Sequence, residues 1–170
     1  PDAIKIIDRF HIIKNLNKSL IEHNKRSYKK LKKAQRKYFS RVWHILTKDW
    51  KKLSKAETSF INLYFELNPY MEIIYDEAQE FREILLHSQG QKRELIELKI
   101  RQWMTKCGEY YSKFCTTLNN WFDQIVNACI YPYSNARQEG LNTSAKLVKR
   151  RGRGIPNTDN FTLRIQAECS

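Results

Sequence analysis

A chain of 170 residues corresponds to one average domain, or to a large piece of one. Its 41% hydrophobic and 12% aromatic residues argue against disorder, and its longest apolar runs stay below the length of a membrane helix. The net charge of +13 favours a polyanionic partner, with nucleic acid first and an anionic membrane second, whereas a basic but merely solvated surface is the alternative.

Residues 3–8 ("AIKIID") are short, β-branched and alternating, and they form the best strand candidate in the chain. Asp8 then ends the strand and is placed to cap the helix that follows. This helix is predicted to run over residues 9–39, with Phe10, Ile13, Leu16 and Leu20 on its packed face.

The stretch from residue 14 to residue 41 holds eleven Lys and Arg residues against a single acid, Glu22. Such a density exceeds ordinary helix decoration and predicts a surface that binds phosphates. Within it we single out one compact run as candidate DNA-binding residues: Lys29, Lys30, Lys32 and Lys33.

Four further helices are predicted over residues 54–67, 70–90, 91–108 and 109–130. Ser54 and Glu57 have the spacing of a capping box, and Pro69 limits that helix to about Leu67. We expect Leu95, Leu98 and Trp103 to point inward from the next-to-last helix. The last one has an apolar stripe that we interpret as core rather than as a platform for bases: Phe114, Leu118, Trp121, Phe122 and Ile125.

The helical residue pattern ends after Ile130, where "YPYS" predicts a turn. A helix is expected over residues 135–150, then a Gly- and Pro-rich loop over 151–157 and a last helix beginning near Thr158 or Asp159. The four cysteines form no CxxC pair and no zinc-ligand spacing with His, so we expect free thiols, no zinc and a reducing compartment: Cys107, Cys115, Cys129 and Cys169.

On a helix, five polar residues after the turn share one face: Asn135, Glu139, Asn142, Lys146 and Lys149. A carboxylate and two carboxamides within two turns suit a hard cation, and the lysines beyond them suit phosphates. An ordinary salt bridge from Glu139 to Arg137 or to a neighbouring segment is the competing interpretation.

"SNARQEGLNTSAKLVKRRGRG" (residues 134–154) followed by "NTDNFTLRI", together with "DRFHIIKNLN" (residues 8–17), resembles signature blocks of bacterial DDE transposases of the ISL-three insertion-sequence group. The two blocks bracket a helical stretch, as they do in that family. Where the family often has a second Asn or similar residue after Asn142 and an aromatic near Gly154, this chain has Thr143 and Gly154 itself.

The resemblance implies an RNase H-like core interrupted by a helical insertion. The expected fold class is mainly α, a bundle-like insertion with the C-terminal remnant of that core and at most one or two short strands. The implied domains are residues 1–8 as the end of a core strand, 9–130 as the insertion and 131–170 as the segment carrying the catalytic helix.

Glu139 maps to the third carboxylate of the catalytic trio and is therefore the implied catalytic residue and metal ligand, for Mg²⁺ or Mn²⁺ in the full-length enzyme. The surrounding residues are the implied DNA contacts: Arg137, Asn142, Lys146, Lys149, Arg150, Arg151 and Arg153. Asp8 and His11 match an Asp-x-x-His element that supports the site in related transposases. Asn135 is a further supporting residue of the implied motif. Alternatively, Asp8 is only the cap of the helix and His11 only a polar residue of its first turn. A third interpretation makes Asp8 the second catalytic Asp.

The chain begins with Pro1 rather than Met, so we expect an excised piece of a longer protein. The resemblance implies that the other two catalytic carboxylates lie on strands upstream of Asp8, so we expect this piece to be inactive by itself and to bind no metal. The leading hypothesis is the C-terminal portion of a transposase that binds transposon DNA. The alternatives are a non-catalytic basic helical module, or remnant of a decayed element, and a domain for self-association. We expect a bacterial cytoplasmic, nucleoid-associated protein without a membrane partner; the sequence does not indicate the DNA sequence recognised, the target or the oligomeric state.

Overall fold

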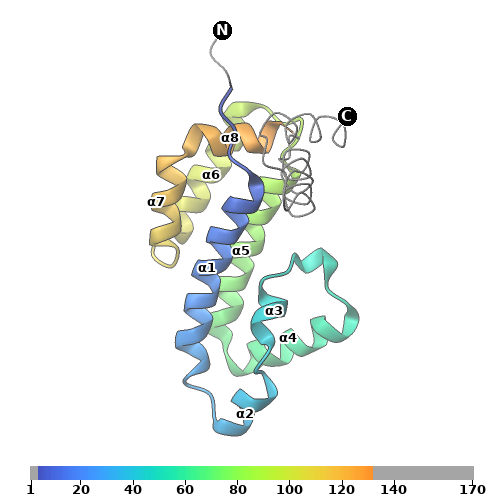
Figure 1. Cartoon of the computed structure of the whole chain (residues 1–170). Helices are drawn as coiled ribbons and strands as arrows, with labels where there is room; N and C mark the ends of the chain where they lie inside the picture. The colour runs from blue at the N-terminus through green and yellow to red at the C-terminus, as the bar shows by residue number, and fades with distance from the viewer. Residues whose placement is uncertain (1–3, 132–170) are drawn as a thin grey trace, which may run out of the picture. The chain divides into compact units, whose positions relative to one another are not determined.

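The computed structural model describes residues 4–131 of the chain (Figure 1). The chain divides into two compact units, residues 1–132 and 133–170, and the described residues all belong to the first. Its elements are α1 (Arg9–Tyr28), α2 (Lys33–Tyr38), α3 (Val42–Leu46), the short 3-10 helix η1 (Trp50–Lys52), α4 (Lys55–Leu67), α5 (Pro69–His87), α6 (Arg93–Cys107), α7 (Ser112–Asn120) and α8 (Phe122–Ile130). The predicted mainly α class is confirmed, and residues 4–131 contain no strand.

The two longest helices, α1 and α5, lie along each other through the middle of this unit (Figure 1). Helix α1 turns Ile12, Leu16 and Leu20 inward, at the four-residue spacing that keeps side chains on one helix face. Each such fully buried side chain contributes about 1.5–3 kcal/mol through removal of apolar surface from water. Helix α3 packs near the end of α1 and α8 near its beginning, while α4 and α6 pack on α5. The turn before α7 reaches the second half of α1, where a His23 ring nitrogen lies 2.7 Å from the Tyr110 carbonyl.

The predicted strand over residues 3–8 is not formed in the described residues 4–8. That segment is extended but meets a helix instead of a second strand. The Ile7 amide donates to the Gln124 carbonyl of α8 at 3.5 Å, and the Asn127 side chain donates to the Lys5 carbonyl at 2.9 Å. A β-branched, alternating sequence needs a neighbouring strand to become a ladder, and residues 4–131 provide none.

The single helix predicted over residues 9–39 is instead two helices, because α1 stops at Tyr28 and α2 begins at Lys33. Like charges four residues apart, such as Lys25 and Lys29, destabilise a continuous helix by a few tenths of a kcal/mol per pair. The chain turns back at this point, where Leu31 packs against the core and the Tyr28 hydroxyl donates to the Arg36 carbonyl.

The predicted start of α1, both ends of α4 and the break between α4 and α5 are confirmed. Asp8 accepts a hydrogen bond from the Phe10 amide at 2.9 Å and caps α1. Ser54 and Glu57 form the reciprocal capping box of α4, with distances of 3.2 and 3.0 Å. Pro69 opens α5 as its first residue, so α4 ends before it at Leu67.

The inward face of α6 differs from the prediction by one residue. Leu95 and Leu98 are exposed at 43% and 51%, while Ile96 and Ile100 are fully buried in line with Trp103. The helix predicted over residues 109–130 is broken at Trp121 into α7 and α8, which leaves that indole 49% exposed. Most of the aromatics nevertheless form core as predicted: Trp103 lies against Phe81 and Phe114 with ring centroids 4.9 and 5.8 Å away. Phe10, predicted to pack, is 62% exposed.

A buried polar network joins α1 to the junction of α4 and α5. The Tyr64 hydroxyl donates to the Asn24 side-chain oxygen at 2.7 Å and accepts from the Asn68 amide at 3.1 Å. The Ser27 hydroxyl donates to the Asn68 side-chain oxygen at 2.6 Å. Because each member is satisfied by another, the network fixes the register of α1 against α4 and α5.

We expect Asn68→Ala to destabilise the chain by about 1–3 kcal/mol, since Ser27 loses its acceptor and Tyr64 loses a donor inside the protein. Urea unfolding followed by circular dichroism measures this change. The matched control is Asn119→Ala on the exposed face of α7, which should stay within about 0.5 kcal/mol of the parent. Equal, small effects at both positions would contradict the role given to the network.

Candidate nucleic-acid interface

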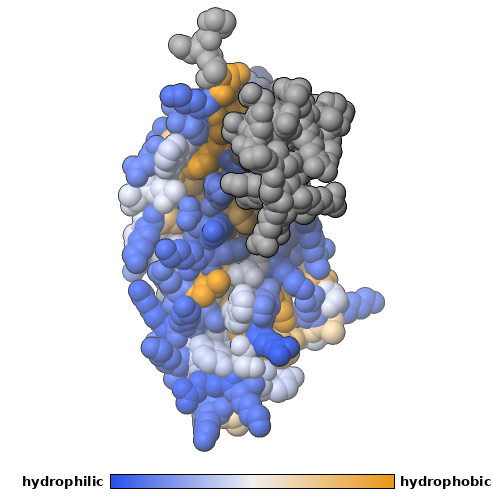
Figure 2. Space-filling model, in the orientation of Figure 1, coloured by the Kyte–Doolittle hydropathy of each residue, from blue (hydrophilic) through white to orange (hydrophobic). Residues whose placement is uncertain are grey.

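Nine exposed cations crowd the end of α1, the following turn and α2. We call them the basic tip: Lys25, Arg26, Lys29, Lys30, Lys32, Lys33, Arg36, Lys37 and Arg41. The stretch 25–41 contains no acid, and none of its cations forms an ion pair with another described residue. Figure 2 shows hydrophilic residues over this end of the molecule. The tip gathers the four predicted DNA contacts, Lys29, Lys30, Lys32 and Lys33, with five further cations.

Elsewhere in the described part of the chain, five cations form ion pairs: Lys48, Lys51, Arg93, Lys106 and Lys113. Lys48 contacts Glu57 at 2.5 Å, and the ammonium together with the Ser54 amide holds the pKa of that carboxyl below its usual value. Lys51 contacts Glu83 at 2.8 Å. The basic tip therefore stands out by the density of its cations along residues 25–41, none of which has an acidic partner among the described residues.

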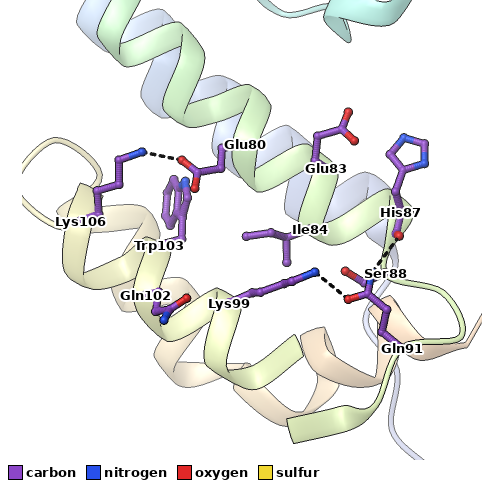
Figure 3. A pocket seen from close by; sticks show the side chains of 10 residues that line it. All are labelled: Glu80, Glu83, Ile84, His87, Ser88, Gln91, Lys99, Gln102, Trp103 and Lys106. Carbon is purple, nitrogen blue, oxygen red and sulfur yellow. Dashed lines mark hydrogen bonds and ion pairs between the residues drawn. The ribbon is translucent and has the colours of Figure 1, made fainter. Parts of the chain in front are cut away.

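The concavity between α5 and α6, of about 390 Å³, is lined by charged groups of both signs (Figure 3). Glu80 and Glu83 line it from α5, and Lys106 reaches Glu80 at 2.7 Å, which raises the pKa of that lysine. Lys99 is turned toward Gln91 at 2.7 Å. Because Lys106 pairs with Glu80 and Lys99 is bound to Gln91, this concavity leaves a polyanion little unpaired positive charge to bind.

The two ends of the described chain lie side by side at the beginning of α1, with Arg9 between them. Its Nε donates to the Ala128 carbonyl at 2.7 Å and its Nη2 donates to the Tyr131 carbonyl at 3.1 Å. The twenty residues of α1 rise about 30 Å, so the basic tip is held that far from the junction. Figure 1 shows α2 and α8 near opposite ends of α1.

Of the predicted supporting residues, Asp8 and His11 lie in this junction. The Asp8 side chain serves as the helix cap, and His11 is exposed on the first turn beside Phe10, with ring centroids 5.8 Å apart. The rest of the predicted site lies outside the described residues: Asn135, Arg137, Glu139, Asn142, Lys146, Lys149, Arg150, Arg151 and Arg153.

The cysteines of the first unit are buried free thiols. Burial raises the pKa of Cys107 and of Cys129 to about 12, and it raises that of Cys115 as well. Within residues 4–131 no three His, Cys, Asp or Glu side chains gather where they might hold a metal ion. No helix among these residues is both long and apolar enough to span a membrane.

Sequence reasoning misses two features of this end-to-end arrangement. Arg9 resembles any other cation of the basic block, and nothing in its spacing distinguishes a residue that binds two carbonyls 119 and 122 positions away. Trp43 also escapes a prediction from local pattern, although it closely follows the basic run and is 42% exposed. The position of a tryptophan at the end of a dense run of cations is the available signal.

The fold and this surface define a basic helical domain in which the described ends, residues 4–9 and 127–131, lie against each other. The chain belongs to the ISL-three group of DDE transposases, since the model of this transposase family matches residues 1–165. The predicted resemblance is confirmed, and with it a transposase-related function. A search of curated proteins and a search of solved structures each found no match.

We expect Arg9→Ala to loosen the junction, because two charged hydrogen bonds to carbonyls are lost, at a cost of about 1.5–3 kcal/mol. Hydrogen exchange should accelerate in peptides covering residues 4–9 and 124–131. Lys14→Ala, on an exposed position of the same helix, is the control and should leave both peptides unchanged. Unaltered exchange in the Arg9 variant would show that the junction is held by other contacts.

Proposed function

We propose that this chain binds transposon DNA through the basic tip and contributes Glu139 as the third metal-binding carboxylate of a transposase. The observation that carries the DNA-binding part is the basic tip itself, nine exposed cations with no ion pair among the described residues. The cations of such a surface repel one another, so binding of an anion that neutralises them is favourable. DNA presents phosphates at regular, closely spaced positions and can neutralise several cations at once.

The geometry of the junction supports the proposal that residues 9–130 form an insertion in a nuclease core. A domain inserted between two segments of another fold must begin and end at nearby points. Here Arg9 binds the carbonyls of Ala128 and Tyr131 directly. The basic tip then projects about 30 Å from the junction, which suits a contact with DNA well away from the reacting phosphate.

The catalytic part of the proposal rests on the family and on the sequence around Glu139. In such a site Mg²⁺ supplies charge neutralisation at the phosphate and activation of the attacking oxygen. The resemblance of residues 134–154 to the family's signature block maps Glu139 to the third carboxylate, so Glu139 would be the ligand that this chain contributes. The cations near it would hold the DNA backbone: Arg137, Lys146, Lys149, Arg150, Arg151 and Arg153.

A non-catalytic nucleic-acid-binding module is the second candidate function. The basic tip favours it equally, because phosphate binding there does not involve Glu139. The two candidates differ only in whether Glu139 matters for DNA cleavage by the complete protein, and self-association belongs to either.

We expect replacement of Lys29, Lys30, Lys32 and Lys33 by Gln to weaken duplex DNA binding and to lower its salt dependence. Each lost phosphate contact reduces the slope of log affinity against log salt by about 0.9. Fluorescence anisotropy of a labelled duplex between about 50 and 200 mM salt measures both effects.

The control removes the same charge from four exposed lysines outside the basic tip, Lys5, Lys52, Lys55 and Lys92. This variant should keep most of the affinity and slope of the parent. If the two quadruple variants lose equal affinity, binding depends on net charge alone and the basic tip has no special role.

In the complete protein we expect Glu139→Gln to abolish Mg²⁺-dependent DNA cleavage and to leave DNA binding intact, since the metal loses a carboxylate while the cations remain. In this 170-residue chain the same change should alter stability by no more than about 0.5 kcal/mol. Glu66→Gln, exposed on α4, is the control. A loss of about 3–5 kcal/mol in the chain would indicate a buried ion pair at Glu139 and contradict the metal-ligand assignment.

A further inference from the structure

An apolar pocket of about 370 Å³ opens between the last turns of α1 and helix α3. Phe39 and Val42 are buried and form its base, and Ile21, Tyr28 and Trp43 also line it. Its volume lies within the range of roughly 300–1,000 Å³ typical of pockets for small organic groups.

One cation lines this pocket, and two more are chain neighbours of its lining residues. Lys25 belongs to the lining, Lys29 follows Tyr28 in the chain, and Arg41 directly precedes Val42. No carboxylate is among the described residues that line the pocket. An occupant of the pocket therefore combines an apolar, flat body with a negative charge at its edge.

The Trp43 side chain is available for contact with a ligand and is not part of the buried core. Its indole is 42% exposed and stacks on the neighbouring His44 ring, with centroids 3.4 Å apart and planes inclined by 28°. Such stacking restricts the indole to few orientations, so little side-chain entropy remains to be lost when a second ring binds.

The other two exposed tryptophans of the described chain lack this setting. Lys51 lies over the Trp50 ring at 5.8 Å, and Trp50 shares its pocket with Glu72 and Asp76. Trp121 lies two residues from Asp123, at the break between α7 and α8. Carboxylates next to these indoles repel a phosphate, whereas the cations next to Trp43 attract it.

We propose that the pocket at Trp43 receives an unpaired base of DNA whose flanking phosphates lie on the basic tip. The proposal rests on the proposed function, because the phosphates would be those that the tip binds. The faces of a paired base are covered by its neighbours in the duplex, so only an unstacked base reaches an aromatic wall. The pocket thus adds a preference for single-stranded, gapped or frayed DNA to an otherwise unspecific electrostatic surface.

The test compares a short labelled oligothymidylate with a blunt duplex, using the 170-residue chain and its Trp43→Ala, Trp43→Phe and Trp121→Ala variants. Loss of one base–aromatic stack corresponds to roughly a 5- to 150-fold loss of affinity. We expect Trp43→Ala to show that loss on the single strand only and to keep a duplex affinity within about twofold of the parent. Trp43→Phe should retain most of the affinity for the single strand. Trp121→Ala should bind both DNAs as the parent does.

Tryptophan fluorescence gives a second readout that does not depend on the stability of the Ala variant. The single strand should quench part of the parent's emission and should leave the emission of Trp43→Phe unchanged. Equal effects of Trp43→Ala on both DNAs, or no effect on either, would overturn the pocket while leaving the basic tip in place. A change in sedimentation without a change in DNA affinity would assign the pocket to a second copy of the chain and also overturn the proposal. Failure of the parent to bind any DNA would reject the proposed function itself.

Discussion

The packing of α1 against α5 is the contact on which the rest of the described structure depends. The apolar face of α1 meets the inward face of α5, and Arg82 of α5 donates to the side chain of Asn17. At one end of this pair the network around Asn68 ties in α4, and at the other end Arg9 ties in α8. Because both ends of the twenty-residue α1 are anchored, the basic tip and the chain junction stay about 30 Å apart.

The distribution of charge follows from the same arrangement. Acids of α4 and α5 face lysines from neighbouring elements, as in the pair of Glu80 and Lys106. These exposed pairs each contribute little to stability, about 0–1 kcal/mol or less. Their larger effect is to offset part of the positive charge on the flanks of the bundle, whereas residues 25–41 carry nine cations and no acid. The turn at Lys29 is exposed to solvent, so its cations are available to an anion.

Local signals in the sequence predicted the helical parts of the fold well. Asp8, the Ser54 and Glu57 pair and Pro69 act through neighbouring backbone groups, so their effect can be determined from a few residues. The strand over 3–8 and the inward face of α6 could not be predicted in this way, because they depend on distant partners. Residues 4–8 lie against α8, and a one-residue rotation of α6 exchanges Leu95 and Leu98 for Ile96 and Ile100. Of the candidate site, the cations at 29–33 were predicted from their density alone, whereas Arg9 and Trp43 acquire meaning only from the residues that the fold brings next to them.

Binding of DNA by the basic tip of the helical unit is tested most directly by hydrogen exchange measured with and without duplex DNA. Exchange should become slower over residues 25–43 and stay unchanged over residues 80–106, where the acids of α5 face α6. Protection of the α5 and α6 surface with none over residues 25–43 would contradict binding at the tip.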